Sequence, residues 1–421
     1  MSPRAEDAAA PPLAGITVLE VGAFMAAPFA AMQLADLGAR VLKVEDPDSG
    51  DAVRGTGPFV DGESSPFLRL NRNKESVALD LKSSAGNAAF RRLAATADVL
   101  VQNLRPGAMA RLGLDFETLR ADNPGLVYAS ASGWGQDGPL AGLAGMDIMA
   151  QARGGLMSIT GEPGGDPVKV GVPVCDLTCA LYVALAVTAA LRERERSGLG
   201  QHVDVSLLES GVSLAVWEAG AHFGDGSVPG PSGSAHQSTA PYQAVRTADG
   251  HVTLGASTER NWSAFCAQFG LEHLREDPRF ADGYSRLLHR DALVAEIERE
   301  TVRWSSRELL AELEGIGVPC APIADYGEVF ADPALTERDF LWRAEHPRLG
   351  GVDQLGSPMR FSRSPAVRAN AGPPLGADTE TVLDEFGQGQ ASEQGQSIEQ
   401  DRSFGQDRSF GQAREFGRDQ S

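Results

Sequence analysis

Short apolar runs alternate with longer mixed stretches through the first half of the chain. Five runs are rich in β-branched and aliphatic residues, as is typical of strands: 16–21, 40–45, 98–101, 126–130 and 202–205. Helices are expected between or after these runs: from Pro28 to near Gly38, over 88–97, up to Asn123 and over 207–217. Strands that alternate with helices predict an α/β domain, with a parallel sheet covered on both faces.

The pattern changes in the second half. Residues 224–234 hold Gly, Ser and Pro at most positions, which is typical of a mobile loop or a domain boundary. Residues 242–254 predict a β-hairpin that turns at Asp249–Gly250, and amphipathic helix dominates 260–313. We therefore expect a smaller α+β domain after the large one.

One apolar stretch, 170–191, contains a single charged residue, Asp176, and is nearly long enough to cross a bilayer. It also contains Gly171 and Pro173, and many of its residues are alanine. Small residues suit a helix in a protein core, where backbones approach closely. We interpret the stretch as a buried helix and expect no membrane contact.

The length of 421 residues leaves room for two or three domains with sizeable cores. Against 37 Lys and Arg stand 57 Asp and Glu, and the net charge of −20 repels phosphate backbones and anionic membrane surfaces. Nucleic acids and membrane surfaces are therefore not expected as partners.

The four cysteines are too few and too irregularly spaced for a disulfide framework: Cys175, Cys179, Cys266 and Cys320. No Cys-x-x-Cys pair is present to bind zinc. Because residues 1–12 are polar and lack the apolar core of a signal peptide, we expect a flexible N-terminus and a reducing, cytoplasmic location.

Residues 388–421 differ in composition from the rest of the chain. They are rich in Gln, Gly, Ser and charged residues, and a six-residue unit repeats from Arg402 onward. Such a composition predicts a disordered tail. The three phenylalanines of the repeat either contact a partner or belong to an extension without function, and we favour the second interpretation.

Several common catalytic motifs are absent from the sequence. No Gly-x-Gly-x-x-Gly follows the first apolar run, and no Gly-Lys-Ser/Thr loop, His-Glu-x-x-His or Gly-x-Ser-x-Gly occurs. The usual dinucleotide, NTP, zinc-protease and serine-hydrolase sites are therefore not expected, and neither is a metal. The first histidine is His202, so no imidazole is available before that position.

Asp176 stands out because its neighbours in the sequence are apolar. Its place before an uncharged run predicts a helix N-terminus, where Asp is among the best capping residues. The same helix dipole would keep a poorly solvated carboxylate ionised and available as a nucleophile. The two interpretations are compatible. Cys175 and Cys179, one helical turn apart, form either a redox pair or part of the core, and we favour the core.

Basic residues gather in one part of this acidic chain. Arg69, Arg72, Lys74 and Lys82 lie close together in sequence, and Arg105 and Arg111 follow the third predicted strand. A solvated charged face explains such a cluster nearly as well as an anion pocket for a phosphorylated ligand.

A series of ordered motifs resembles the class III CoA-transferases, a family that also contains the α-methylacyl-CoA racemases. The resemblance runs from about Leu13 to Gly387. It is carried by 12–20, 36–45, 73–82, 97–107, 197–205 and 374–379, together with Asp147, Gln151–Ala152, Gly154–Gly155 and the segment around Asp176.

The resemblance implies a Rossmann-like large domain, a small α+β domain and an interlocked, ring-like homodimer. The expected ranges are 13–220 for the large CoA-binding domain, 221–240 for a linker and active-site loop, 241–345 for the small domain and 346–387 for a return to the large domain.

The resemblance also implies roles for single residues. Asp176 occupies the position of the family's catalytic aspartate. CoA enters as a substrate rather than as a permanently bound cofactor, and its implied contacts are Phe24, Met25, Ala26, Leu79, Lys82, Asn103, Leu104, Arg105, Arg111 and Met146. Met25 and Asp46 replace a glutamine and an arginine of the formyl-CoA transferases, so formyl or oxalyl specificity is not implied.

The residues favour a transferase over a racemase. A racemase needs two acid/base groups, one for each face of the α-carbon. In the family's racemases one of them is a histidine before an aspartate, and this chain has Met146–Asp147 there. A racemase that recruits another histidine stays an alternative. A catalytically silent CoA-binding scaffold is a third, which the presence of Asp176 opposes.

A transferase of this family needs one carboxylate, which forms covalent aspartyl intermediates with the acyl group and with CoA. Residues 233–243 resemble the segment of members that use succinyl-CoA and a dicarboxylic acid, with Gly233, Ser234 and His236 as substrate-loop residues. His236 either positions a carboxylate or has only a structural role. The Gly/Ser-rich loop before it is either a lid that excludes water or a plain linker.

Overall fold

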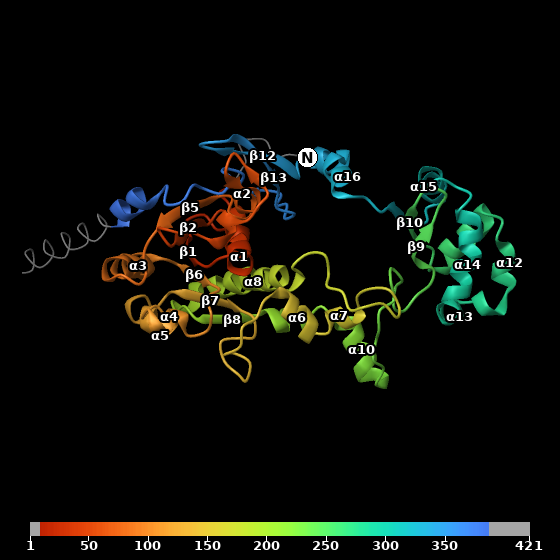
Figure 1. Cartoon of the computed structure of the whole chain (residues 1–421), viewed down its shortest axis with the longest axis horizontal. Helices are drawn as coiled ribbons and strands as arrows, with labels where there is room; N and C mark the ends of the chain where they lie inside the picture. Colours follow the sequence, from red (N-terminus) through yellow and green to blue (C-terminus); the bar gives the residue numbers. More distant parts are fainter. Residues whose placement is uncertain (1–8, 387–421) are drawn as a thin grey trace, which may run out of the picture. The chain divides into compact units, whose positions relative to one another are not determined.

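The computed structural model describes residues 9–386, which form two compact units (Figure 1). Of the described residues, 9–144, 176–207 and 342–386 make up the larger unit, and 145–175 and 208–341 make up the smaller one. The division falls inside one helix, between Cys175 and Asp176. The sequence analysis placed 145–175 and 208–220 with the large domain, whereas here they group with the smaller unit. The expected repeat tail lies outside the described residues.

A six-stranded parallel sheet forms the centre of the larger unit, in the order β5-β2-β1-β6-β7-β8 (Figure 1). Its strands are β1 (Thr17–Val21), β2 (Arg40–Glu45), β5 (Lys74–Ala78), β6 (Val99–Gln102), β7 (Val127–Ser132) and β8 (His202–Ser206). Five of them coincide with the expected runs. The edge strand β5 was not expected, because its sequence KESVA mixes charged and apolar residues.

The order of the strands creates a crevice between β1 and β6. From β1 the chain proceeds to β2 and β5 on one side, and then returns to β6, β7 and β8 on the other. The segments after β1 and β6 therefore lead to strands on opposite sides of this point. In open parallel sheets this is where ligands bind.

Alternating side chains of the strands face two different layers. Leu19 and Leu42 pack with Phe90 and Leu93 of α3 (Ser84–Thr96) in one core. The intervening positions belong to the opposite face, where α1 (Ala26–Asp36) contacts β1, β2 and β6. Further elements of this unit are η1 (Ala52–Gly55), β3 (Phe59–Val60), β4 (Glu63–Ser64), α2 (Ser65–Leu70), α4 (Ala108–Arg111) and α5 (Phe116–Asp122).

Helix α8 (Val174–Ser197) is the apolar stretch that the sequence analysis expected to be buried. By length and composition alone it is long enough to cross a membrane, a test that the core helices of globular proteins also pass. Val183 and Val187 are fully buried, but Leu181 and Leu185 are 52% and 64% exposed in the single chain. The expectation of a buried helix is thus correct for one face only, because composition does not show which face lacks a neighbour.

The smaller unit combines a three-stranded antiparallel sheet with helices. The expected hairpin is present as β9 (Tyr242–Arg246) and β10 (His251–Gly255), and β11 (Cys320–Pro322) pairs with β10. Trp262, Phe265 and Phe280 are central to its core. Its remaining helices include α11 (Glu259–Gln268), α12 (Glu272–Glu276), η2 (Pro278–Phe280), α13 (Gly283–Leu288), α14 (Arg290–Thr301), α15 (Ser306–Gly315), α16 (Tyr326–Ala331) and α17 (Pro333–Glu337).

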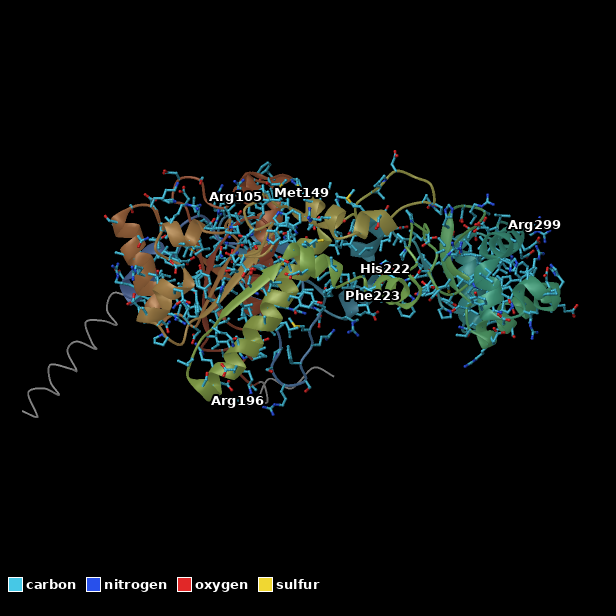
Figure 2. All side chains as sticks on the ribbon, turned by 90° about the horizontal axis from the view of Figure 1, so that it is seen from below. Arg105, Met149, Arg196, His222, Phe223 and Arg299 are labelled. Carbon is cyan, nitrogen blue, oxygen red and sulfur yellow. The ribbon has the colours of Figure 1, made fainter. Side chains whose placement is uncertain are left out.

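The helix expected over 207–217 is two helices, α9 (Leu207–Val212) and α10 (Val216–Asp225). The chain turns over Ser213 and Leu214 between them. None of the residues of α10 is buried, and Phe223, labelled in Figure 2, is 85% exposed. Two shorter helices, α6 (Asp147–Arg153) and α7 (Leu156–Ile159), complete the smaller unit.

The last described segment returns to the larger unit and covers the edge strand β5. It forms the hairpin of β12 (Leu341–His346) and β13 (Gly350–Leu355) before it reaches β5. The Asp378 carboxylate accepts the N–H of Ser76 at 2.8 Å, and the Thr379 hydroxyl accepts that of Ala78 at 2.9 Å. The motif at 374–379 therefore closes an otherwise unpaired edge.

Candidate active site

The turn that follows β1 is held by an amide side chain from the neighbouring strand. Asn103, directly after β6, accepts the N–H of Ala23 at 3.1 Å and donates to its carbonyl at 2.9 Å. A Cβ at Gly22 would lie 2.3 Å from the Asn103 side-chain oxygen, so only glycine allows this approach. Phe24 has a φ of 60° and is 57% exposed. Asn103, expected to contact CoA, thus shapes the turn that contains Phe24.

Buried charges fix the same turn from the other side. Lys43, fully buried on β2, lies 2.6 Å from the Glu20 carboxylate and 2.8 Å from that of Asp51, and it donates to the Gly22 carbonyl at 3.1 Å. Asp51 in turn accepts the N–H of Phe24 at 3.2 Å. Burial disfavours the Lys43 ammonium, but the two carboxylates outweigh it and raise the pKa of Lys43. The sequence analysis missed Asp51, because nothing in its local sequence indicates this contact.

A second buried lysine completes this cluster. The Lys74 ammonium lies 2.6 Å from Glu20 and donates to the Pro28 carbonyl in α1 at 2.8 Å. Burial and the nearby Lys43 lower the pKa of Lys74 to about 8, against the attraction of Glu20. We call Glu20, Lys43, Asp51 and Lys74 the buried charge cluster. It ties the end of β1 to the start of α1.

The basic residues Arg69, Arg72, Lys74 and Lys82, interpreted as either a solvated charged face or an anion pocket, do not form one accessible group. Arg72 is 5% exposed and paired with Asp36, and Lys74 belongs to the buried charge cluster, so neither is available to a ligand. Neither interpretation fits these two residues, because a sequence cluster of cations does not reveal their buried counter-charges. Arg69 binds the backbone and side chain of Ser65.

Three of the predicted cations remain accessible. Lys82, Arg105 and Arg111 are exposed, and within residues 9–386 none of them forms an ion pair (Arg105 is labelled in Figure 2). They follow the carboxyl ends of β5 and β6, and the turn with Phe24 follows β1. Parallel strands bring these ends to one edge of the sheet. The other expected CoA contacts on this edge are Met25, Ala26, Leu79 and Leu104.

Asp176 lies in the first turn of α8, as expected, and is partly buried. The helix begins at Val174, so Asp176 is its third residue rather than its N-cap. The acceptor at the helix start is Asp147 of α6, whose carboxylate binds the N–H of Cys175 at 2.9 Å. An amide N–H in the first turn would otherwise lack a partner. Asp147 thus holds the turn that carries Asp176.

A buried glutamine orients this acceptor. Gln151, one turn after Asp147 in α6, donates to its carboxylate at 2.6 Å and accepts the N–H of Val170 at 2.9 Å. Gln151 is fully buried. The motif Asp147…Gln151 therefore links α6 to the segment that leads into α8. Met146, an expected CoA contact, precedes Asp147 in the smaller unit and is 62% exposed.

The cysteines next to Asp176 belong to the core. Cys175 and Cys179 are free and fully buried. A Cβ on Gly211 would lie 2.7 Å from the Cys175 sulfur, which shows how closely α9 approaches this thiol. The core interpretation of both residues is confirmed.

The expected substrate loop is fixed to the hairpin of the smaller unit. The N–H of Gly233 donates to the Gly161 carbonyl at 2.9 Å, and the Ser234 hydroxyl accepts the N–H of Ala244 at 3.1 Å. The ring of His236 stacks on Tyr242, with 5.0 Å between ring centroids. All these contacts lie within the smaller unit, so the loop has a defined conformation there.

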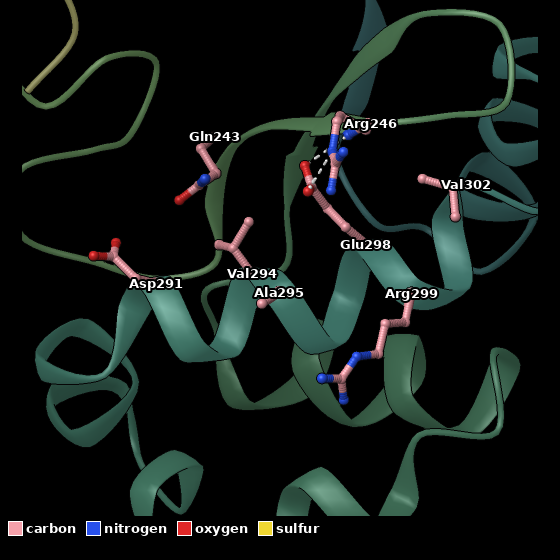
Figure 3. Close-up of a pocket in the computed structure, with 8 residues that line it drawn as sticks. All are labelled: Gln243, Arg246, Asp291, Val294, Ala295, Glu298, Arg299 and Val302. Atoms are coloured by element: carbon pink, nitrogen blue, oxygen red, sulfur yellow. Dashed lines mark hydrogen bonds and ion pairs between the residues drawn. The ribbon is translucent and has the colours of Figure 1, made fainter.

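A hollow between β9 and α14 contains none of the expected site residues (Figure 3). Its arginines are neutralised, since Arg246 pairs with Glu298 at 2.7 Å and Arg299 pairs with Glu296. The hollow therefore offers no unpaired cation to a CoA phosphate. Among residues 9–386, no group of three His, Cys, Asp or Glu side chains is arranged to hold a metal ion.

Comparison with known proteins identifies the family. The model of CoA-transferase family III matches residues 13–379. The chain belongs to CoA-transferase family III. A succinate–glutarate CoA-transferase from Agrobacterium fabrum is 38% identical over 383 residues, which cover 89% of this chain and 96% of the relative. A succinyl-CoA:glutarate CoA-transferase from Mus musculus is 36% identical over 375 residues, 89% of this chain and 86% of the relative.

Solved structures show the same fold. A CaiB/BaiF family protein from Brucella suis is 36% identical, with a TM-score of 0.81, and the match covers 90% of this chain and all of that one. The protein is therefore a class III CoA-transferase, as the resemblance implied. The named relatives above are transferases, which leaves the racemase alternative without support from them.

The buried charge cluster predicts a strong effect of Lys43→Met on the stability of the transferase. The substitution leaves the carboxylates of Glu20 and Asp51 buried without their shared cation, and we expect the free energy of unfolding to fall by about 3–5 kcal/mol. Denaturant unfolding measures this change. Lys82→Met, at an exposed lysine, is the control and should cost less than about 0.5 kcal/mol. Equal effects of the two would contradict the role of the cluster.

The position of Asp147 predicts that Asp147→Ala impairs turnover as well as stability. Loss of the acceptor for the Cys175 N–H should cost about 0.5–2 kcal/mol and fray the turn that holds Asp176, so kcat should fall. Asp282→Ala is the matched control, because Asp282 accepts the Ser285 N–H at 2.8 Å at the start of α13. It should cost similar stability with kcat unchanged. A similar kcat in both variants would show that Asp147 only stabilises the fold.

Proposed function

We propose that this transferase moves CoA from succinyl-CoA to a dicarboxylic acid, with Asp176 as the covalent nucleophile. The observation that carries the proposal is the similarity, over nearly the full length of both chains, to an enzyme named for succinate and glutarate. The mouse relative carries the same pair of acids in its name. Glutarate is therefore the first acceptor to test.

The chemistry proceeds by exchange of acyl groups. The Asp176 carboxylate attacks the thioester carbonyl of succinyl-CoA, the C–S bond breaks, and CoA leaves as thiolate from a mixed anhydride. The thiolate then attacks the carbonyl carbon of Asp176, which releases succinate and leaves an aspartyl-CoA thioester. The acceptor carboxylate attacks this thioester and expels the thiolate again. The thiolate finally takes the acyl group of the acceptor, and Asp176 is free.

The first turn of α8 suits such a nucleophile. The positive end of the helix dipole favours the ionised carboxylate, and that form attacks the thioester. Backbone N–H groups at a helix start also stabilise the oxyanion of a tetrahedral intermediate. Asp147 contributes indirectly, because it keeps this turn intact through Cys175.

CoA is placed at the carboxyl edge of the parallel sheet in this proposal. The unpaired cations Lys82, Arg105 and Arg111 would bind its phosphates, since guanidinium and ammonium groups are the usual phosphate ligands of proteins. The turn with Phe24 would line the pantetheine or adenine portion. No permanently bound cofactor is required, because each intermediate retains the energy of the thioester.

The acyl intermediates survive only where water is excluded. We assign this role to the loop around Gly233 and Ser234, which would act as a lid, and His236 would orient the acceptor carboxylate. The contacts of this loop with Gly161 and Tyr242 give it the defined conformation that such a role needs.

A second copy of the chain is expected to cover the apolar faces that are exposed in one copy. Leu181 and Leu185 on α8 and Trp217 and Phe223 on α10 are each more than half exposed. Exposed apolar groups of this size are typical of subunit contacts. We propose the interlocked homodimer that the family resemblance implied, in the cytoplasm.

The proposal predicts that hydroxylamine traps an activated Asp176. The purified transferase is mixed with succinyl-CoA and hydroxylamine, and peptide mass spectrometry should find a hydroxamate at Asp176 only when succinyl-CoA is present. Asp176→Asn should lower transfer to glutarate by at least about 10³-fold, because an amide is not a nucleophile of this kind. Asp291→Asn is the matched control, because Asp291 is an exposed carboxylate that also lies in the first turn of a helix, α14.

Two results would contradict the proposal. One is full transfer activity in Asp176→Asn, since this would exclude the aspartyl intermediates. The other is the absence of a hydroxamate together with the uptake of solvent deuterium at the α-carbon of a 2-methylacyl-CoA, which would favour a racemase. Activity with other acids but not with glutarate would change only the assigned acceptor.

A further inference from the structure

Three buried or partly buried side chains form a hydrogen-bonded chain that ends at the loop after β6. Gln102, the last residue of β6, accepts the N–H of Leu104 at 2.7 Å. The same side chain donates to the Ser130 hydroxyl on β7 at 2.9 Å. That hydroxyl lies 2.9 Å from Nε2 of His202 on β8. Gln102 and Ser130 are 3% and 1% exposed, so no solvent replaces these bonds.

The chemistry of the groups fixes the direction of two of these three hydrogen bonds. The Leu104 N–H is a donor, so it binds the carbonyl oxygen of the Gln102 amide, and the amide nitrogen must donate to Ser130. The Ser130 hydroxyl keeps its own proton, and in its contact with Nε2 of His202 either group is the donor, depending on the imidazole tautomer.

His202 is the fixed end of this hydrogen-bonded chain. Its ring stacks on Phe116, with 5.7 Å between centroids, and packs edge-on against Tyr128 at 5.4 Å. The Tyr128 hydroxyl donates in turn to the Leu114 carbonyl at 3.2 Å. The aromatic contacts limit the rotation of the imidazole, so Nε2 stays aligned with Ser130.

The other end of the hydrogen-bonded chain, at Leu104, lies next to the crevice between β1 and β6. Asn103 stands between Gln102 and Leu104, and its side chain holds Ala23 in the turn after β1. A shift of the Leu104 N–H would move the backbone of Asn103 and release this contact. Gln102 thus acts on both loops at the place where parallel sheets bind ligands.

A buried polar chain of this kind is costly unless all its groups are satisfied, and when satisfied it specifies one backbone conformation. The other residues of β6, Val99, Leu100 and Val101, are fully buried apolar side chains. A leucine at position 102 would continue this pattern and fill the space. The glutamine is the residue that adds a backbone contact.

We propose that Gln102 is a positioning residue for the acyl-CoA substrate, which it serves by holding the loop 103–105 through its bonds to Leu104 and Ser130. The proposal rests on the assignment of CoA to this edge of the sheet. Gln102 itself touches no substrate. Its effect on the reaction is carried by the backbone of the loop and by Asn103.

The test compares Gln102→Leu with a matched variant of another buried glutamine. In Gln102→Leu, KM for succinyl-CoA should rise about tenfold, the equivalent of one lost hydrogen bond, with kcat and KM for the acceptor acid within about twofold of the parent. Gln354→Leu is the control, since Gln354 is 2% exposed and donates to the Leu68 carbonyl at 3.0 Å. It should reduce stability with KM unchanged.

A second variant and a second readout keep the test independent of a simple folding defect. Gln102→Glu retains an acceptor for Leu104 and should recover most of the affinity for succinyl-CoA. Hydrogen–deuterium exchange should become faster in the peptides that cover 22–26 and 99–107 for Gln102→Leu, but not for Gln354→Leu. Both measurements use the full-length protein.

Equal KM values in the two leucine variants, or unchanged exchange at 99–107, would overturn the proposal. A parent enzyme that transfers CoA from no acyl-CoA would instead refute the proposed function. In that case, the exchange data and the equilibrium binding of CoA to both variants still decide whether Gln102 positions the loop.

The lowered pKa of His202 predicts a pH dependence of stability. Burial against Phe116 and Tyr128 lowers the pKa of His202, although the carboxylates of Asp204 on β8 and Glu117 on α5 act in the opposite direction. Below the unfolded pKa of about 6.5 the unfolded state binds more protons than the folded one, so the free energy of unfolding falls as the pH falls from about 6.5.

Denaturant unfolding between about pH 5 and pH 8 measures this loss. His202→Gln keeps an acceptor for Ser130 without a titratable ring, and its stability should vary less over this range. The same pH profile in the parent and in this variant would show that the titration of His202 does not contribute to the pH dependence of stability.

Discussion

The buried charge cluster is the interaction on which the larger unit depends. Two lysines and two carboxylates, on three neighbouring strands and the segment after β2, are withdrawn from water, and each charge lies within 2.8 Å of an opposite one. Charges in such a place stabilise little by themselves, because their attraction is offset by lost hydration. What they determine is geometry, since Lys43 and Asp51 also bind the backbone of Gly22 and Phe24.

The crevice between β1 and β6 is consequently built from both sides by side chains that are not exposed to a ligand. Asn103 binds the turn after β1 from the side of β6, and the buried charge cluster binds the same turn from the side of β2. The accessible groups of this edge include Phe24 in the turn and the unpaired cations that follow the strands. A site of this design recognises a substrate through a preformed surface, which reduces the entropy lost on binding.

Much of the larger unit could be predicted from the sequence, because strands with continuous apolar runs and helices with glycine or proline boundaries carry a local signal. β5 was missed because its five residues include Lys74 and Glu75, whose charges are satisfied only by distant parts of the fold. The break between α9 and α10 was missed for a related reason, since the sequence there has no proline. Local patterns do not report long-range contacts.

The same limit applied to the site. The position of Asp176 at the start of α8 followed from the uncharged run after it, whereas the loops after β1, β5 and β6 were implied only by the family resemblance. The pairing of Arg72 with Asp36 and the role of Asp147 as the acceptor for Cys175 depend on partners 36 and 28 residues away. Only a structure brings such partners together.

The closure of β5 by Asp378 and Thr379 has a consequence for folding during synthesis on the ribosome. The two contacts join residues more than 300 positions apart, so the edge of the sheet stays open until nearly the whole protein has left the ribosome. Throughout that interval the nascent sheet presents a row of unpaired backbone groups, to which other incomplete chains can add a strand. Premature termination before residue 378 would thus yield a sheet with an unpaired, aggregation-prone edge rather than a smaller enzyme.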